Sequence, residues 1–276
     1  PMIADPPNPK PIPAGGVRIE FNDVEFQYPA ASEVSLASLE EVAVLDARES
    51  EQVLHGINFT VEPGQTVALV GSSGAGKSTI ANLVSRLYDV TGGSITLNGV
   101  DLRDAAAADI HSRIGMVTQD SHLFHTSIRD NLTLGHRDVS DERIWEILRA
   151  ARLEEVVAHM PAGLDTVVGE RGYRLSGGER QRMAIARLLI AAPDAVVLDE
   201  ATASLDSTSE AAVQQALDEA LEARTALVIA HRLSTVVNAD EILVLEGGHI
   251  IERGTHAELL AANGRYAELY TTQFQQ

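Results

Sequence analysis

The stretch that decides the fold is Gly71-Ser72-Ser73-Gly74-Ala75-Gly76-Lys77-Ser78-Thr79. It follows a short apolar run that ends at Val70 and opens a predicted helix over residues 78–87. Glycines in such a turn let successive backbone N–H groups point into one concavity, and the helix start adds the positive end of its dipole. The stretch therefore predicts a loop that binds the phosphates of an oligophosphate.

Each side chain in this loop has a physical reason. Gly74 and Gly76 allow the backbone to curl, and Ser78 offers a hydroxyl to Mg²⁺. Lys77 and Lys10 are the only lysines among 21 basic residues. A compact ammonium reaches the outer phosphates where a planar guanidinium is too large. A glycine-rich turn without a ligand is the alternative, but the strand before the loop and the helix after it favour a phosphate site.

Composition excludes several classes of protein. With 276 residues and 45% hydrophobic content, the chain can form one large α/β domain or two small ones. A net charge of -19 argues against a surface that binds a nucleic-acid backbone, so no nucleic-acid partner is expected. The absence of cysteine excludes disulfides and thiolate metal sites. No stretch has the length and apolarity of a membrane span or a signal peptide.

The chain outside the phosphate loop alternates buried strands with helices, which predicts a βαβ architecture. The predicted buried strands cover residues 67–70, 114–117, 195–198 and 226–229. The predicted helices cover residues 78–87, 141–150, 153–159, 178–190 and 207–221. Helices alone are expected between the second and third of these strands, as an inserted helical subdomain.

The two ends and one insertion have patterns of their own. Residues 1–16 are rich in proline and predict an extended tether. Residues 19–28 predict a strand with a bulge at Asn22-Asp23, and residues 30–52 predict an acidic, solvated insertion without assigned chemistry. Residues 242–245 and 249–252 flank Glu246-Gly247-Gly248 and predict a hairpin.

Two acids, Asp199 and Glu200, follow the predicted strand over residues 195–198. Ligands in parallel sheets collect at the carboxyl ends of the strands, so these carboxylates are expected beside the phosphate loop. Asp199 is then placed to hold Mg²⁺ through a water, and Glu200 to accept a proton from an attacking water. The alternative is a pair of acids that stabilises the start of a helix at Ala201.

A third motif, Leu175-Ser176-Gly177-Gly178-Glu179-Arg180-Gln181-Arg182, precedes Asp199. Together the three motifs resemble the nucleotide-binding domain of ATP-binding cassette (ABC) transporters, and the resemblance covers residues 17–276. It implies a P-loop NTPase fold, in the α/β class, with a mostly parallel central sheet, an antiparallel β subdomain and the helical subdomain over about residues 120–180. It also implies an ATPase that uses Mg²⁺.

The resemblance assigns roles to further residues. Tyr28 corresponds to the aromatic that stacks on adenine, His231 to the switch histidine at the γ-phosphate, and Gln119 to the glutamine that links the metal site to the membrane domain. Glu200, His231 and Gln119 are then the catalytic residues, and Ser78, Gln119 and Asp199 the Mg²⁺ ligands.

A second copy of the domain is also implied, because Ser176 and Gly178 mark a second anion site in a chain that already has one. In the family, two domains meet head to tail, so that Ser176, Gly177, Gly178 and Asp206 of one copy contact the nucleotide of the other. The alternative is that Ser176 only caps a helix, with Glu179 as its capping-box partner.

Residues 123–132 and 169–172 resemble exporters that fuse membrane and nucleotide domains in one polypeptide. The expected function is therefore that of an ATP-hydrolysing motor domain at the cytoplasmic face of the cell membrane. Residues 1–16 then form the linker from a transmembrane domain upstream. An ABC importer subunit and a soluble ABC ATPase are the alternatives. Whether membrane helices are encoded upstream of Pro1 would decide between the exporter and the importer subunit.

Overall fold

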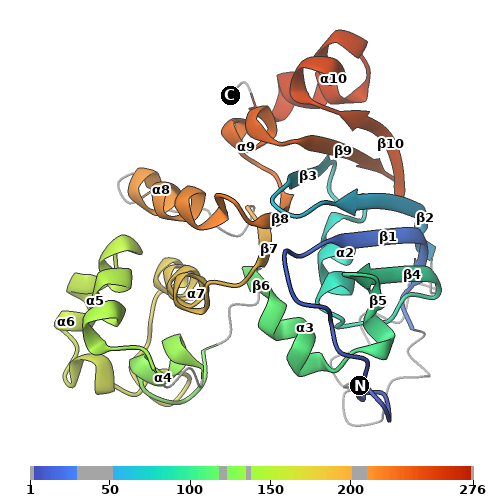
Figure 1. The fold of residues 1–276 in the computed structure, drawn as a ribbon. Helices are drawn as coiled ribbons and strands as arrows, with labels where there is room; N and C mark the ends of the chain where they lie inside the picture. The colour runs from blue at the N-terminus through green and yellow to red at the C-terminus, as the bar shows by residue number, and fades with distance from the viewer. Residues whose placement is uncertain (1–2, 30–51, 118–122, 135–137, 201–209, 275–276) are drawn as a thin grey trace.

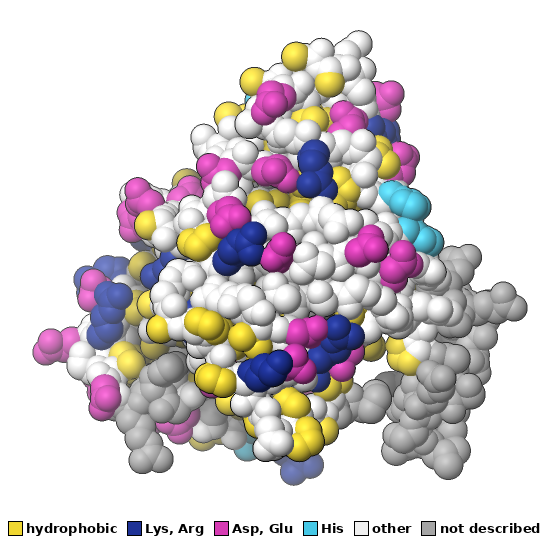
Figure 2. Space-filling model, turned by 45° about the vertical axis from the view of Figure 1, so that its right-hand side comes forward, with side chains coloured by type: hydrophobic (Ala, Val, Ile, Leu, Met, Phe, Trp, Pro, Cys, Tyr) yellow, Lys and Arg dark blue, Asp and Glu magenta, His cyan; other side chains and the backbone are white. Residues whose placement is uncertain are grey.

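The computed structural model describes residues 3–29, 52–117, 123–134, 138–200 and 210–274. Two β-sheets and a separate group of helices make up the described part of the chain (Figure 1). On the face seen in Figure 2, acidic and basic side chains are interspersed, so no basic stretch gathers there. Within the described ranges, no helix has the length and apolarity needed to cross a membrane.

The larger sheet is mostly parallel, with the strand order β10-β9-β3-β8-β7-β6. Only β10, which pairs with β9, runs antiparallel. Its strands are β3 (Thr66–Gly71), β6 (Ile114–Val117), β7 (Ala195–Asp199), β8 (Thr225–Ile229), β9 (Glu241–Glu246) and β10 (His249–Gly254). Four of them are the predicted apolar runs, which are apolar throughout because both faces of the sheet are covered. The predicted hairpin is β9 and β10.

The smaller sheet is antiparallel, with the order β2-β1-β4-β5. Its strands are β1 (Ile19–Gln27), β2 (Gln52–Val61), β4 (Gly92–Leu97) and β5 (Val100–Asp101). The bulge expected in β1 is present, since its pairing with β2 shifts between Phe21 and Val24 and Asp23 has a φ of 51°. The residue patterns alone did not predict β2, β4 and β5. Gln52 lies in β2 and not in the acidic insertion, whose other residues are outside the described ranges.

Helix α2 (Lys77–Val84) lies between the two sheets. Its apolar side chains Ile80, Leu83 and Val84 are buried in one cluster with residues of both sheets. Burying one such side chain stabilises the fold by roughly 1.5–3 kcal/mol. The helix ends before residue 87, earlier than predicted, because Arg86 adopts a left-handed conformation with a φ of 57°. This packing fixes the position of α2, whose first residue, Lys77, ends the phosphate loop.

The predicted helical subdomain forms a second core beside the larger sheet (Figure 1). It contains α4 (Ile128–Thr133), α5 (Asp141–Ala150), α6 (Glu154–Ala158) and η4 (Gly163–Asp165). Helix α7 (Gly177–Ala191) connects it to the sheet: Met183 and Ala186 pack into the helical core, whereas Ile185 and Leu188 pack against the sheet. Helix α7 is therefore shared between the helical core and the core of the larger sheet.

The remaining helices are η3 (Leu102–Asp104), α3 (Ala107–Arg113), α8 (Glu210–Leu221), α9 (Leu233–Asn238), α10 (His256–Ala262), α11 (Arg265–Leu269) and the π-helical turn η5 (Tyr270–Phe274). Several of them cover the larger sheet: α8 packs on β7 and β8, and α9 to α11 pack on β3 and β9. Helices α9 to α11 share one core cluster with β3 and β9, in which Val236 and Tyr266 are fully buried.

The proline-rich N-terminal segment is extended, without a helix or strand over residues 3–16, and it is attached to the domain. Asp5 accepts a hydrogen bond from the backbone N–H of Ala107 at 2.9 Å. Arg113 donates to the carbonyl oxygens of Pro13 and Gly15 at 3.0 and 2.6 Å. Hydrogen bonds thus continue the packed unit upstream of Val17, although the composition predicted a tether without packing.

Candidate functional site

Three neighbouring strands bring the predicted chemistry to one edge of the larger sheet. Leu69 of β3 pairs with Ile229 of β8, which in turn pairs with Asp199 of β7. The segments that follow these three residues therefore leave the sheet side by side. They carry the phosphate loop, Glu200 and His231.

The phosphate loop has the backbone conformations that its glycines predicted. Gly74 and Gly76 have φ values of 81° and 109°, a region that residues with a Cβ rarely adopt. The structure adds a steric role for Gly71, which the residue pattern does not predict. A Cβ on Gly71 would lie 2.4 Å from the carbonyl oxygen of Leu245 in β9. The loop is thus pressed against the neighbouring strand.

Lys77 lies across this loop. Its Nζ donates a hydrogen bond to the carbonyl oxygen of Gly71 at 2.6 Å. Partial burial lowers the pKa of Lys77, while the carboxylate of Asp199 acts in the opposite direction. The ammonium and Asp199 are therefore close enough to interact electrostatically. Ser73 and Ser78 are exposed at the same end of α2.

Tyr28 lies next to the residue that ends the loop. Its hydroxyl and Oγ1 of the buried Thr79 are 2.9 Å apart. The tyrosine ring contacts Phe26 and Tyr88 edge to face, with centroid distances of 4.8 and 5.3 Å. The structure thus brings Tyr28 to α2, with part of its ring used for packing.

Glu200 is a buried acid whose carboxylate has several hydrogen-bond donors. Only 6% of the residue is exposed. Oε1 accepts from the backbone N–H groups of His231 and Arg232 at 3.0 and 3.2 Å, and Oε2 accepts from the hydroxyl of Thr235 at 2.6 Å. Burial raises the pKa of Glu200, and these three donors oppose the rise. No local pattern in the sequence indicates the contact with Thr235.

His231 lies at the same edge with an exposed side chain. Desolvation and the nearby Lys77 ammonium lower its pKa, whereas Asp199 acts in the opposite direction. The imidazole is therefore neutral at neutral pH. These effects link His231, Lys77 and Asp199 in one electrostatic site.

The third motif begins α7. Ser176 Oγ accepts from the backbone N–H of Glu179 at 3.2 Å, and Glu179 Oε1 accepts from the N–H of Ser176 at 2.8 Å. This is the capping box expected under the alternative interpretation of the motif. Ser176 and Gly177 are exposed, and no atom lies within 4 Å of a Cβ built on Gly178. The capping role thus leaves this surface open.

Two predicted site residues, Gln119 and Asp206, lie outside the described residues. Among the residues that are described, no group of three or more His, Cys, Asp or Glu side chains could hold a metal ion without other ligands. The donors present at the loop are a hydroxyl, Ser78, and a carboxylate, Asp199. Both offer oxygen, the ligand type that Mg²⁺ prefers, and Asp199 lies close to the Lys77 ammonium. The described part of the site therefore fits Mg²⁺ bound together with phosphates.

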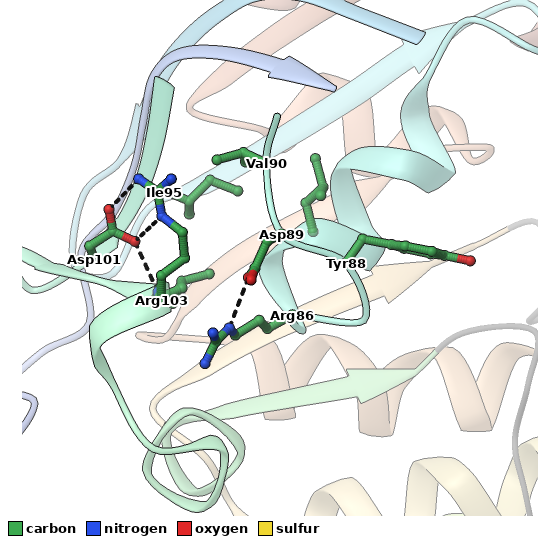
Figure 3. A pocket seen from close by; sticks show the side chains of 9 residues that line it. Arg86, Tyr88, Asp89, Val90, Ile95, Asp101 and Arg103 are labelled. Atoms are coloured by element: carbon green, nitrogen blue, oxygen red, sulfur yellow. Dashed lines mark hydrogen bonds and ion pairs between the residues drawn. The ribbon is translucent and has the colours of Figure 1, made fainter. Parts of the chain in front are cut away.

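A small hollow lies at the other end of α2 (Figure 3). Its charged residues are paired with one another: Arg103 with Asp101 at 2.7 Å, and Arg86 with Asp89 at 2.9 Å. The eight residues of α2, about 12 Å of helix, lie between Lys77 at its start and the hollow beyond its end. The hollow is therefore separate from the phosphate site.

A family model described as "ABC transporter" matches residues 54–203, more than half of the chain. The chain belongs to the ABC transporter family. This agrees with the P-loop NTPase fold and with the order of the three motifs.

Curated relatives of this ABC transporter domain include longer proteins. The chain is 43% identical over 282 residues to ABC transporter B family member 6 of Dictyostelium discoideum, covering 99% of this chain and 40% of the relative. It is 46% identical over 221 residues to a putative multidrug export ATP-binding/permease protein of Staphylococcus aureus, covering 80% of this chain and 38% of the relative. The chain thus spans about two fifths of the length of these relatives.

A solved structure agrees with this comparison. The structure of a bacterial Atm1-family ABC exporter with ATP bound matches with a TM-score of 0.82 and 37% identity, covering 99% of this chain and 45% of that one. The matches to a putative multidrug export protein and to an Atm1-family exporter favour the exporter branch of the family over the importer alternative. Domains of this family are in general ATPases that use MgATP.

Proposed function

We propose that this chain binds MgATP and hydrolyses it, and that hydrolysis drives export across a membrane. The observation that carries the proposal is the edge of the larger sheet, where the phosphate loop, Glu200 and His231 follow adjacent strands. A cation, a buried carboxylate and a neutral imidazole are thereby grouped around one phosphate-binding loop. These are the groups that phosphoryl transfer to water requires.

The loop holds the nucleotide in this proposal. Backbone N–H groups of residues 71–79 bind the phosphate oxygens, and Lys77 leaves the carbonyl of Gly71 to neutralise the outer phosphates. Ser78, Asp199 and Gln119 would hold Mg²⁺, which supplies further neutralisation of phosphate charge. Tyr28 contributes its ring to the adenine base.

Glu200 acts as the general base. It accepts a proton from water while the water oxygen bonds to the γ-phosphorus and the bond to the bridging oxygen breaks, giving ADP and phosphate. Burial favours proton acceptance by raising the pKa of the carboxyl group. His231, neutral at neutral pH, can donate a hydrogen bond to the γ-phosphate without repelling Lys77.

Two copies of the domain would complete two sites. The exposed start of α7 offers Ser176, Gly177 and Gly178 to a nucleotide on another copy, and Asp206 joins them in this proposal. The partner is either an identical or a related domain. A transmembrane domain, connected through residues 1–16, would place the pair at the cytoplasmic face of the cell membrane.

The Glu200→Gln variant tests the proposed activity. It keeps the shape of the side chain but accepts no proton, so we expect ATP binding to persist while turnover falls at least about a hundredfold. Size-exclusion chromatography with ATP should show an accumulated dimer. Lys77→Ala serves as the comparison, because it should weaken ATP binding itself. Full turnover of Glu200→Gln would exclude Glu200 as the base.

A further inference from the structure

The carboxylate of Glu200 is held by one short segment, residues 231–235. Its Oε1 accepts hydrogen bonds from the backbone N–H groups of His231 and Arg232. Its Oε2 accepts one from the hydroxyl of Thr235 at 2.6 Å. Glu200 directly follows the strand β7, whereas the segment follows the neighbouring strand β8. The contact therefore joins two parts of the chain that are 35 residues apart in sequence.

The two oxygens of this carboxylate are not equivalent. Each oxygen of an ionised carboxylate has about two acceptor positions. Two N–H donors occupy both acceptor positions of Oε1. Oε2 has one acceptor position left, so it is the oxygen that can take a proton from water. Oε2 is also the oxygen that Thr235 contacts.

The backbone contacts alone do not orient Oε2. The terminal torsion of a glutamate side chain joins an sp³ carbon to an sp² carbon, and its energy wells are broad. Donors on Oε1 hold that atom in place but let the carboxylate plane turn about it. A donor on Oε2 fixes the plane, and Thr235 supplies one.

Thr235 itself is anchored. It lies in α9, where a β-branched side chain has few allowed rotamers. The next residue, Val236, is fully buried in the core cluster of α9 to α11. The hydroxyl therefore has a position set by the core of the domain.

We propose that Thr235 is a positioning residue for hydrolysis: its hydroxyl orients Oε2 of Glu200 toward the water that Glu200 deprotonates. This inference rests on the proposed function of Glu200 as the base. Thr235 touches neither the phosphate loop nor its lysine in any hydrogen bond described for this chain, so its effect reaches catalysis through Glu200.

The test compares Thr235→Val with Thr235→Ser in the whole 276-residue chain. Valine has the shape of threonine without the donor, and serine keeps the donor. We expect Thr235→Val to lower kcat about tenfold, a fraction of the 10²–10⁴-fold that general base catalysis contributes, with KM for ATP changed less than twofold. Thr235→Ser should retain kcat within about twofold. Ser234→Ala is the matched control, because it removes an exposed hydroxyl from the same helix.

A double variant shows whether Thr235 acts through Glu200. In the Glu200→Gln background, adding Thr235→Val should cause no further loss of the residual turnover. Equal losses in both backgrounds would mean that Thr235 acts independently and would overturn the inference. A change in KM alone, with kcat of Thr235→Val unchanged, would overturn it as well.

Folding is measured by thermal unfolding of each variant. If Thr235→Val does not fold, Thr235→Ser still decides, since a folded serine variant with a tenfold lower kcat contradicts a role for the hydroxyl. The outcome for Glu200 is separate: full turnover of Glu200→Gln removes the proposed base, whereas an inactive Glu200→Gln with an unaffected Thr235→Val removes only this inference.

Discussion

At the scale of single residues, buried polar groups are tolerated because each has partners. Asn131 is fully buried at the start of the helical subdomain, accepts from the N–H of Phe124 at 2.9 Å and donates to its carbonyl at 3.0 Å. Tyr266 is fully buried among α9 to α11, and its hydroxyl lies 2.6 Å from Nδ1 of His256. An unpaired polar group at such a site would cost about 1–3 kcal/mol.

Tyr266 makes the free energy of unfolding depend on pH in the alkaline range. Burial, with the nearby Tyr270, raises the pKa of its phenol to about 12 from an ordinary value of 10.0. Below pH 10 both folded and unfolded chains keep the proton; between pH 10 and 12 only the folded chain does. The contribution to the free energy of unfolding is therefore complete below pH 10 and lost by about pH 12.

Urea unfolding at increasing pH measures this loss. Tyr266→Phe lacks the ionisable group, so the difference in unfolding free energy between wild type and variant should shrink as the pH rises through this range. Curves that stay parallel would show that Tyr266 does not titrate as expected. Ultraviolet absorbance of the phenolate, compared between the two proteins, reports the same pKa directly.

At the scale of elements, the turn between β9 and β10 supports the phosphate loop. Gly248 donates its N–H to the carbonyl of Ala75 in the loop at 3.1 Å, and its own carbonyl accepts from the N–H of His55 at 3.0 Å. A Cβ on Gly248 would lie 2.0 Å from the carbonyl oxygen of Val53. The turn is thus held between β2 and the loop, where only glycine fits.

Gly248→Ala should therefore weaken ATP binding. The added methyl group must displace either β2 or the turn, which removes the hydrogen bond to Ala75. We expect about a tenfold lower affinity, equivalent to about 1.4 kcal/mol, in a titration with a fluorescent ATP analogue.

The control for this prediction is the neighbouring glycine. Gly247 also has a positive φ, of 55°, but no atom lies within 4 Å of a Cβ built on it. Gly247→Ala should then show only the conformational cost of about 1 kcal/mol in unfolding, with unchanged ATP affinity. Equal affinities for the two variants would exclude support of the loop by this turn.

At the scale of the whole molecule, the two halves of the proposed site lie on different bodies. Lys77 begins α2 between the two sheets, whereas Ser176 caps α7, which is shared with the helical subdomain (Figure 1). A head-to-tail pair would place the start of α7 from one copy against the phosphate loop of the other.

Mixing two inactive variants tests this arrangement. Lys77→Ala removes the loop cation, and Gly178→Asp places a negative charge where the proposed phosphate contact lies. In a mixed dimer, the unchanged Lys77 of the Gly178→Asp chain faces the unchanged Gly178 of the Lys77→Ala chain. One of the two sites is then intact, and the other carries both substitutions. Random mixing should then restore hydrolysis to at most about a quarter of the wild-type rate.

An inactive mixture, with mixed dimers demonstrated by differently tagged chains, would contradict the shared site. Each variant alone serves as the baseline. Restoration in the mixture but in neither variant alone would require that residues from both copies build one site.

The local order of residues was enough to predict the buried strands, the phosphate loop and the position of Asp199 and Glu200. Apolar runs, glycines before a helix and acids after a strand act through neighbours in the chain, so their pattern is visible in the sequence. The shift in β1 at Asn22-Asp23 and the hairpin at Gly247-Gly248 were visible for the same reason.

Other features were decided by tertiary structure alone. Strands β2 and β4 pair with β1 across long stretches of chain, and the N-terminal segment is held by Arg113 about a hundred residues later. Thr235 reaches Glu200, and Gly248 reaches Ala75, only once the larger sheet has aligned its strands. Such contacts join segments whose distance depends on the packing of everything between them, and no local pattern of residues carries that distance.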